Sequence, residues 1–195
     1  MLGLKATMKK ILLLCAASIS IACMTTACSP SPETRSGADP DPTTQREIAQ
    51  GKLVGTRGRD NAMAWYGVPY AAPPLGTLRW RAPRPAPAWQ SEFQAIDRSS
   101  RCLQFASGFE PGFDEGDLAG SEDCLHLNVW APATTPSRHL PVMFWIHGGG
   151  NVWGFAGQYE MGALAQRENL IVVSVNYRLG PFGWFAHQAL RDTAE

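Results

Sequence analysis

The sequence predicts an α/β fold, and three neighbouring segments carry that prediction. Residues 140–148, "LPVMFWIHG", and residues 170–178, "LIVVSVNYR", are near-continuous apolar runs, as expected of strands that are covered on both faces. Between them, residues 159–168 place Met161, Leu164 and Ala165 at helical spacing. A helix between two uniformly apolar strands predicts a parallel βαβ unit.

The segments before this unit predict small antiparallel strands that lead into a mainly parallel sheet. Residues 51–71 alternate apolar and polar side chains around two glycines, and residues 124–132 alternate again, which predicts a half-buried strand. Residues 72–89 contain five prolines, which forbid regular structure and predict an ordered wrap over a surface. A parallel sheet needs more strands and covering helices than these segments supply, so we expect an N-terminal part of a larger domain.

The first residues are typical of an export signal. Lys9 and Lys10 precede an apolar run, 11–22, that is too short to cross a bilayer, so residues 1–27 predict a signal peptide. Small residues before Cys28 resemble a bacterial lipoprotein signal, which would attach a lipid there and hold the protein at the cell-envelope membrane. Cys23 is the alternative lipid site and plain secretion the alternative fate. Residues 28–46, rich in Pro, Ser and Asp, predict a disordered tether, which leaves 47–195 as the incomplete domain.

Composition limits the classes of function. The chain is 45% hydrophobic and 17% charged, as in ordinary globular proteins, and its formal net charge of zero gives no electrostatic case for nucleic acid. Outside the export segment only Cys102 and Cys124 remain, and two thiols in an exported protein are most simply a disulfide.

Gly148, Gly149 and Gly150 follow an apolar strand directly, and ordering three glycines costs much backbone entropy. Such a run predicts either a tight corner or backbone N–H groups aimed at a ligand. A phosphate loop is disfavoured, because neither G-x-G-x-x-G nor a following Gly-Lys-Ser/Thr is present. His147 ends a buried strand, which argues against a general base, and the other histidines are too scattered for a metal site.

Four motifs occur in order: "GVPYAAPPLGTLRW", "SEDCLHLNVWAP", "WIHGGG" and "VNYRLGPFGW". With this order and spacing, residues 48–188 resemble the carboxylesterase type B (cholinesterase-like) family of α/β-hydrolases. The resemblance implies that the backbone amides of Gly149 and Gly150 form an oxyanion hole. It also implies substrate contacts from Gly148, Asn151 and Trp153, although Trp153 could equally be a core residue. It implies no cofactor and no metal.

The same resemblance assigns structural roles. Arg79 and Glu122 match positions where the family forms an ion pair, and Arg178 resembles an arginine that pairs with an acid further downstream. Cholinesterase-like members bind the choline cation on a tryptophan in the disulfide loop. The segment between Cys102 and Cys124 contains three phenylalanines and no tryptophan, which favours uncharged carboxylic esters.

The catalytic triad is incomplete in this chain. A serine esterase of this fold carries its nucleophile in G-x-S-x-G, and that motif does not occur here. Ser174 lies inside a predicted buried strand and is a poor candidate. We therefore expect the N-terminal portion of an exported serine carboxylesterase, truncated before the nucleophile elbow and inactive alone. The alternatives are a non-catalytic binding or adhesion member of the same fold and a functionless truncated product.

Overall fold

The computed structural model describes residues 38–98, 100–106, 114–134 and 139–191. Its strands are β1 (Arg46–Ile48), β2 (Gly51–Val54), β3 (Thr56–Arg57), β4 (Met63–Pro69), β5 (Phe93–Gln94), β6 (Gln104–Phe105), β7 (Leu118–Ala119), β8 (His126–Ala131), β9 (Val142–Ile146) and β10 (Ile171–Val175). Its helices are α1 (Gly162–Glu168), α2 (Gly180–Trp184) and α3 (Gln188–Arg191), with short 3₁₀ turns η1 (Pro42–Thr44), η2 (Arg59–Asn61), η3 (Gly76–Leu78) and η4 (Ala156–Gln158).

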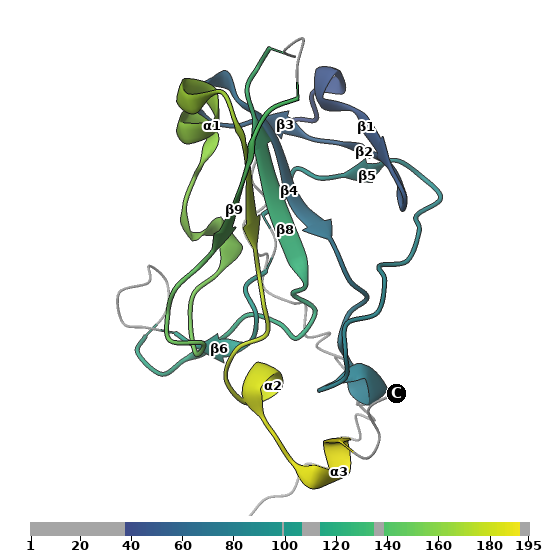
Figure 1. Ribbon diagram of the computed structural model, residues 1–195, viewed down its shortest axis with the longest axis vertical. Coiled ribbons are helices and arrows are strands. Elements are labelled where there is room, and N and C mark those ends of the chain that lie inside the picture. The colour runs from purple at the N-terminus through teal and green to yellow at the C-terminus, as the bar shows by residue number, and fades with distance from the viewer. Residues whose placement is uncertain (1–37, 99, 107–113, 135–138, 192–195) are drawn as a thin grey trace, which may run out of the picture. The chain divides into compact units, whose positions relative to one another are not determined.

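A five-stranded sheet in the order β3-β4-β8-β10-β9 is the central element (Figure 1). β9 and β10 are parallel and are joined through α1, so the predicted βαβ unit is confirmed. β10–β8, β8–β4 and β4–β3 are antiparallel. The described part of the sheet is therefore mixed, and its parallel part is the β9–β10 pair.

The short strands predicted in residues 51–71 are confirmed as β2, β3 and β4. β1 and β2 form an antiparallel hairpin that β5 extends in parallel, and β3 pairs antiparallel with β4. The register of β4 shifts between Trp65 and Val68, where Gly67 has a φ of 65° and its amide donates to Asn128 Oδ1 at 2.9 Å. The buried amide side chain on β8 thus satisfies the backbone group that the bulge leaves without a sheet partner.

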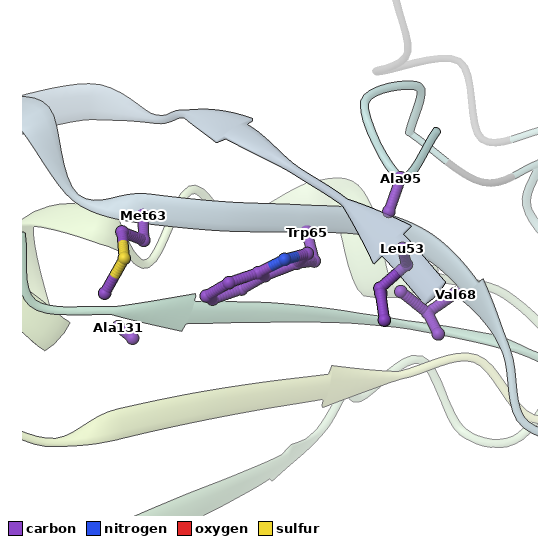
Figure 2. Close-up of a cluster of buried hydrophobic side chains, with 6 residues drawn as sticks. All are labelled: Leu53, Met63, Trp65, Val68, Ala95 and Ala131. Atoms are coloured by element: carbon purple, nitrogen blue, oxygen red, sulfur yellow. The ribbon is translucent and has the colours of Figure 1, made fainter. Parts of the chain in front are cut away.

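Alternation along β4 distributes the core over two faces of the sheet. On one face Met63, Trp65 and Val68 pack with Leu53, Ala95 and Ala131 (Figure 2). On the other face Ala64 and Tyr66 pack with Trp130, Val172 and Ala165 of α1. The helix of the βαβ unit therefore covers the Trp130 face.

Three expectations of burial were wrong. β9 was expected to be covered on both faces, but Val142, Phe144 and Ile146 are 60%, 58% and 63% exposed, because no described element packs beyond this edge strand. β10 is only alternately buried. β8 was expected to expose its second face, yet Asn128 and Trp130 there are fully buried beneath α1 and η4.

The helix begins three residues later than the spacing predicted. Glu160 accepts from Tyr66 Oη at 2.9 Å, from Arg98 Nη2 at 2.6 Å and, through its other oxygen, from the Gly162 amide at 3.2 Å. These contacts tie Glu160 to other segments and to the amide of Gly162, the first residue of α1. α1 ends at Glu168, and Asn169 directly after it has a left-handed φ of 50°.

Residues 72–89 form the expected wrap. Their only regular structure is the 3₁₀ turn η3 and a single β-bridge between Pro85 and Ala71. The predicted tether was wrong for residues 38–46. Thr44 is fully buried and its Oγ1 accepts from the Gly55 amide at 2.8 Å, while Asp41 pairs with Arg57, so this stretch belongs to the folded unit. The predicted signal peptide, the lipid site Cys28 and the first part of the tether lie outside the described residues.

Candidate active site

The candidate site is the segment 147–154, here called the glycine loop, which follows β9 directly. His147 is 2% exposed, and its ring stacks on Tyr177 with centroids 4.4 Å apart. The Tyr177 hydroxyl donates to the His147 carbonyl at 2.7 Å. The start of the loop is thereby fixed to the segment that follows β10.

Burial lowers the pKa of His147 below its ordinary value, and its Nδ1 contact with the Gly148 carbonyl at 2.9 Å opposes this only in part. The neutral ring donates through Nδ1 to that carbonyl. Nε2 is buried and has no partner among the described residues. His147 is therefore placed as a structural ring that supports the loop.

Gly149 makes the turn of the loop. Its carbonyl accepts from the amides of Val152 at 3.1 Å and Trp153 at 3.2 Å. Its φ is 115°, and a Cβ on it would lie 1.9 Å from the Trp153 carbonyl oxygen. Only glycine fits there. Gly150 also has a positive φ, 61°, but a Cβ there would meet nothing within 4 Å.

The hydrogen bonds of the described residues use the Gly149 carbonyl but neither the Gly149 nor the Gly150 amide. Gly150 is exposed and Gly149 is partly exposed. Unpaired backbone donors in a fixed turn can bind a negatively charged oxygen. The assignment of these two amides to an oxyanion hole stays a prediction of the sequence.

The far end of the loop is held by buried polar side chains. Gln104 Oε1 accepts from the Gly154 amide at 2.7 Å, and its Nε2 donates to the Gly154 carbonyl at 3.0 Å. Just beyond, Ala156 donates to Asn176 Oδ1 at 2.7 Å and accepts from Ser174 Oγ at 2.8 Å. Each end of the glycine loop is thus held by its own hydrogen bonds.

A disulfide and an ion pair support the neighbouring segments. Cys102 and Cys124 are bonded, with an S–S distance of 2.02 Å, so the predicted disulfide is confirmed. The Arg79 guanidinium donates through Nε to Glu122 Oε2 at 2.6 Å and through Nη2 to Oε1 at 2.5 Å. This bidentate contact joins the proline-rich wrap to the segment that enters the disulfide.

Residues 42–193 match the model of the carboxylesterase family. The chain belongs to the carboxylesterase family. It is 40% identical over 159 residues to acetylcholinesterase of Electrophorus electricus, covering 76% of this chain and 25% of that protein. It is 43% identical over 136 residues to para-nitrobenzyl esterase of Bacillus subtilis strain 168, covering 69% of this chain and 27% of that enzyme.

Solved structures of esterases share the fold. A thermophilic PNB esterase superposes with a TM-score of 0.69 at 37% identity, covering 78% of this chain and 31% of that one. The α/β-hydrolase class predicted from the sequence is thereby confirmed. This carboxylesterase-family chain spans about a quarter of the length of the curated relatives it matches.

The remaining predicted site residues lie on the surface of the glycine loop. Gly148 and Asn151 are exposed, and Trp153 is 40% exposed, so Trp153 is not a core residue in this chain. Asn151 has a left-handed φ of 63°, and its carbonyl accepts from the Gly180 amide at 2.7 Å. The loop thus also contacts the start of α2.

The structure does not place Ser174 where a nucleophile would be accessible. Its side chain is fully buried in β10 and donates to a backbone carbonyl. An apolar hollow of about 820 Å³ lies over the Trp65 face of the sheet and includes no residue of the glycine loop. That hollow is therefore separate from the glycine loop.

Sequence reasoning missed the residues that hold the loop: Gln104, Gly154, Asn176, Tyr177 and Gly180. Asn176, Tyr177 and Gly180 lie in the motif "VNYRLGPFGW", and Gln104 lies two residues after Cys102, but these positions alone indicate no hydrogen-bond partner. Within the described ranges, no helix is long and apolar enough to cross a bilayer.

Proposed function

We propose that this chain supplies the oxyanion hole and the structural disulfide of an exported serine carboxylesterase whose nucleophile, acid and base lie outside these 195 residues. The single observation that carries the proposal is the pair of unpaired amides at Gly149 and Gly150 in a loop fixed at both ends. The relatives named above are esterases by name, which supports the same reaction class.

The chemistry follows from where charge develops. A serine attacks the ester carbonyl while a histidine takes the serine proton, and negative charge forms on the carbonyl oxygen. Gly149 and Gly150 donate to that oxygen. Because their loop is already fixed, the donors need no reorganisation as the charge appears, and each is worth about 3–4 kcal/mol of transition-state stabilisation. The mechanism uses only side chains and amides, so we propose no cofactor and no metal.

The substrate is a small uncharged carboxylic ester. Gly148 offers open space beside the donors, and Asn151 and Trp153 present one polar and one aromatic side chain on the same loop. The segment between Cys102 and Cys124 carries no tryptophan for a choline cation. We therefore expect p-nitrophenyl esters to be better substrates than choline esters.

The test is turnover by the full product of the reading frame that contains this chain. We expect a G-x-S-x-G motif downstream and hydrolysis of p-nitrophenyl acetate. Gly150→Ala places a methyl group beside the donors and should lower kcat/KM at least tenfold. Gly76→Ala is the matched control, because Gly76 also has a positive φ, 53°, and open space but lies in the wrap.

Absence of the serine motif, or the same rate in Gly150→Ala as in Gly76→Ala, would reject the proposal. A product that binds esters without turnover would favour the non-catalytic binding member of the fold.

We also propose that the protein is exported and lipid-anchored at Cys28 through the predicted signal peptide. The formed disulfide supports an oxidising compartment. Radiolabelled palmitate should enter the wild-type chain and not Cys28→Ala. Labelling that persists in Cys28→Ala and disappears in Cys23→Ala would move the anchor to the other cysteine.

A further inference from the structure

Gln104 makes an unusual set of contacts for a residue outside the glycine loop. It is 4% exposed, and its side-chain amide exchanges two hydrogen bonds with the backbone of Gly154. The same Nε2 also donates to the Cys102 carbonyl at 2.8 Å. Both N–H donors and the oxygen of this buried amide thus make hydrogen bonds that join two backbone segments.

Gly154 transmits this contact to the donors. A Cβ on Gly154 would lie 2.6 Å from the Gly148 carbonyl oxygen and 2.6 Å from His147 Nδ1, so its backbone packs directly on the start of the loop. Its φ of 110° permits this approach only for glycine. A shift of Gly154 would therefore displace the residues that precede Gly149.

The backbone around Gln104 is fixed by a disulfide and by a strand pairing. Cys102, two residues earlier, is bonded to Cys124, and Gln104 pairs with Ala119 in the β6–β7 ladder. The Leu103 amide donates to the Ser121 carbonyl at 3.0 Å. The disulfide loop thus provides a fixed point from which the Gln104 side chain reaches across to the glycine loop.

We propose that Gln104 is a positioning residue of the oxyanion hole, which sets the direction of the Gly149 and Gly150 amides from the disulfide loop through Gly154. This inference rests on the proposed function. The consequence is specific. When Gln104 loses its side-chain amide, the Gly149 and Gly150 N–H groups change direction, even if the rest of the fold is kept.

The first test needs no turnover. The full 195-residue chain is labelled with ¹⁵N-glycine and its amide spectrum is compared in Gln104→Met and Asn128→Leu. Asn128 is the matched control, because it is also a fully buried amide that accepts from one backbone N–H, that of Gly67, on another part of the sheet.

We expect Gln104→Met to shift the signals of Gly148, Gly149, Gly150 and Gly154 and to leave Gly67 in place. Asn128→Leu should do the reverse. Unchanged glycine-loop signals in Gln104→Met, or equal shifts in both variants, would overturn the inference. If Gln104→Met does not fold, Gln104→Glu replaces it, since the carboxylate keeps the acceptor for the Gly154 amide and loses the donor. Gln104→Glu should still shift the glycine-loop signals. Signals that do not shift in Gln104→Glu would count equally against the proposal.

The second test uses the full gene product with p-nitrophenyl acetate. A displacement of donors by about 1 Å predicts a loss of 10- to 100-fold in kcat, with KM changed less than threefold. Asn128→Leu should retain kcat. Failure of the proposed function would appear as no turnover in the wild type, whereas failure of this inference would appear as unshifted glycine-loop signals.

Discussion

Replacing Gly149 by alanine tests the geometry of the glycine loop most directly. The new Cβ would lie 1.9 Å from the Trp153 carbonyl oxygen, so the two must separate by about 1 Å to reach even the 3.0 Å that real Cβ atoms essentially never undercut. That movement breaks the bonds from the Val152 and Trp153 amides to the Gly149 carbonyl, each worth about 1 kcal/mol. Alanine at a φ of 115° adds about 1–3 kcal/mol of strain.

Because Val152 and Trp153 are exposed, water recovers part of the hydrogen-bond loss, and we expect Gly149→Ala to destabilise the chain by about 2–4 kcal/mol. With a urea slope of about 2 kcal/mol/M, the unfolding midpoint should fall by about 1–2 M. Gly148→Ala is the stability control, since a Cβ there meets nothing within 4 Å and its φ is not in the left-handed range. Equal midpoints for the two variants would refute the turn described here.

Removing the disulfide with Cys102→Ala and Cys124→Ala should lower the free energy of unfolding by about 3 kcal/mol, since the bond spans 22 residues. Urea denaturation measures this change, and an unchanged unfolding midpoint in the double variant would contradict the prediction. Burial lowers the pKa of His126 and of His147, so the unfolded chain binds these protons first as pH falls. Stability should be fully present above about pH 7 and should decline as pH falls through about 6.5 toward the folded pKa values. Thermal melts from pH 8 to 5 check this, and a melting temperature that rises toward pH 5 would count against it. Among the described strands β9 is an exposed apolar edge, so the 195-residue chain should self-associate. Phe144→Lys should reduce the aggregate seen in sedimentation. Equal sedimentation of the wild type and Phe144→Lys would exclude this edge as the cause.

The order of elements was predictable because local pattern decides it. The apolar runs gave β9 and β10 with α1 between them, and the prolines of residues 72–89 excluded regular structure there. Cys102 and Cys124 could be paired by elimination. The family resemblance predicted the ion pair between Arg79 and Glu122, which no spacing in the sequence indicates.

Burial was predicted less well, because it depends on what packs outside a segment. The uniform apolar sequence of β9 specifies two covered faces, and the described elements cover neither fully. Asn128 was assigned to a polar face, yet it is buried, since the bulge at Gly67 needs a side-chain acceptor that only the folded sheet brings near. Thr44 was likewise predicted to lie in the disordered tether. It is ordered because its hydroxyl accepts from the Gly55 amide, eleven residues later.

The glycine loop separates what a local sequence can specify from what it cannot. Three glycines allow Gly149 and Gly150 to take positive φ angles, but permissive backbone has no preferred direction of its own. The direction is imposed from residues distant in sequence: Tyr177 holds the His147 carbonyl, and Gln104 holds Gly154. Since ordering glycine is costly, two donors can stay unpaired in a fixed turn only while these contacts supply the free energy that keeps the turn. In the proposed oxyanion hole the motif therefore leaves the two amides unpaired, and contacts from distant segments set their direction.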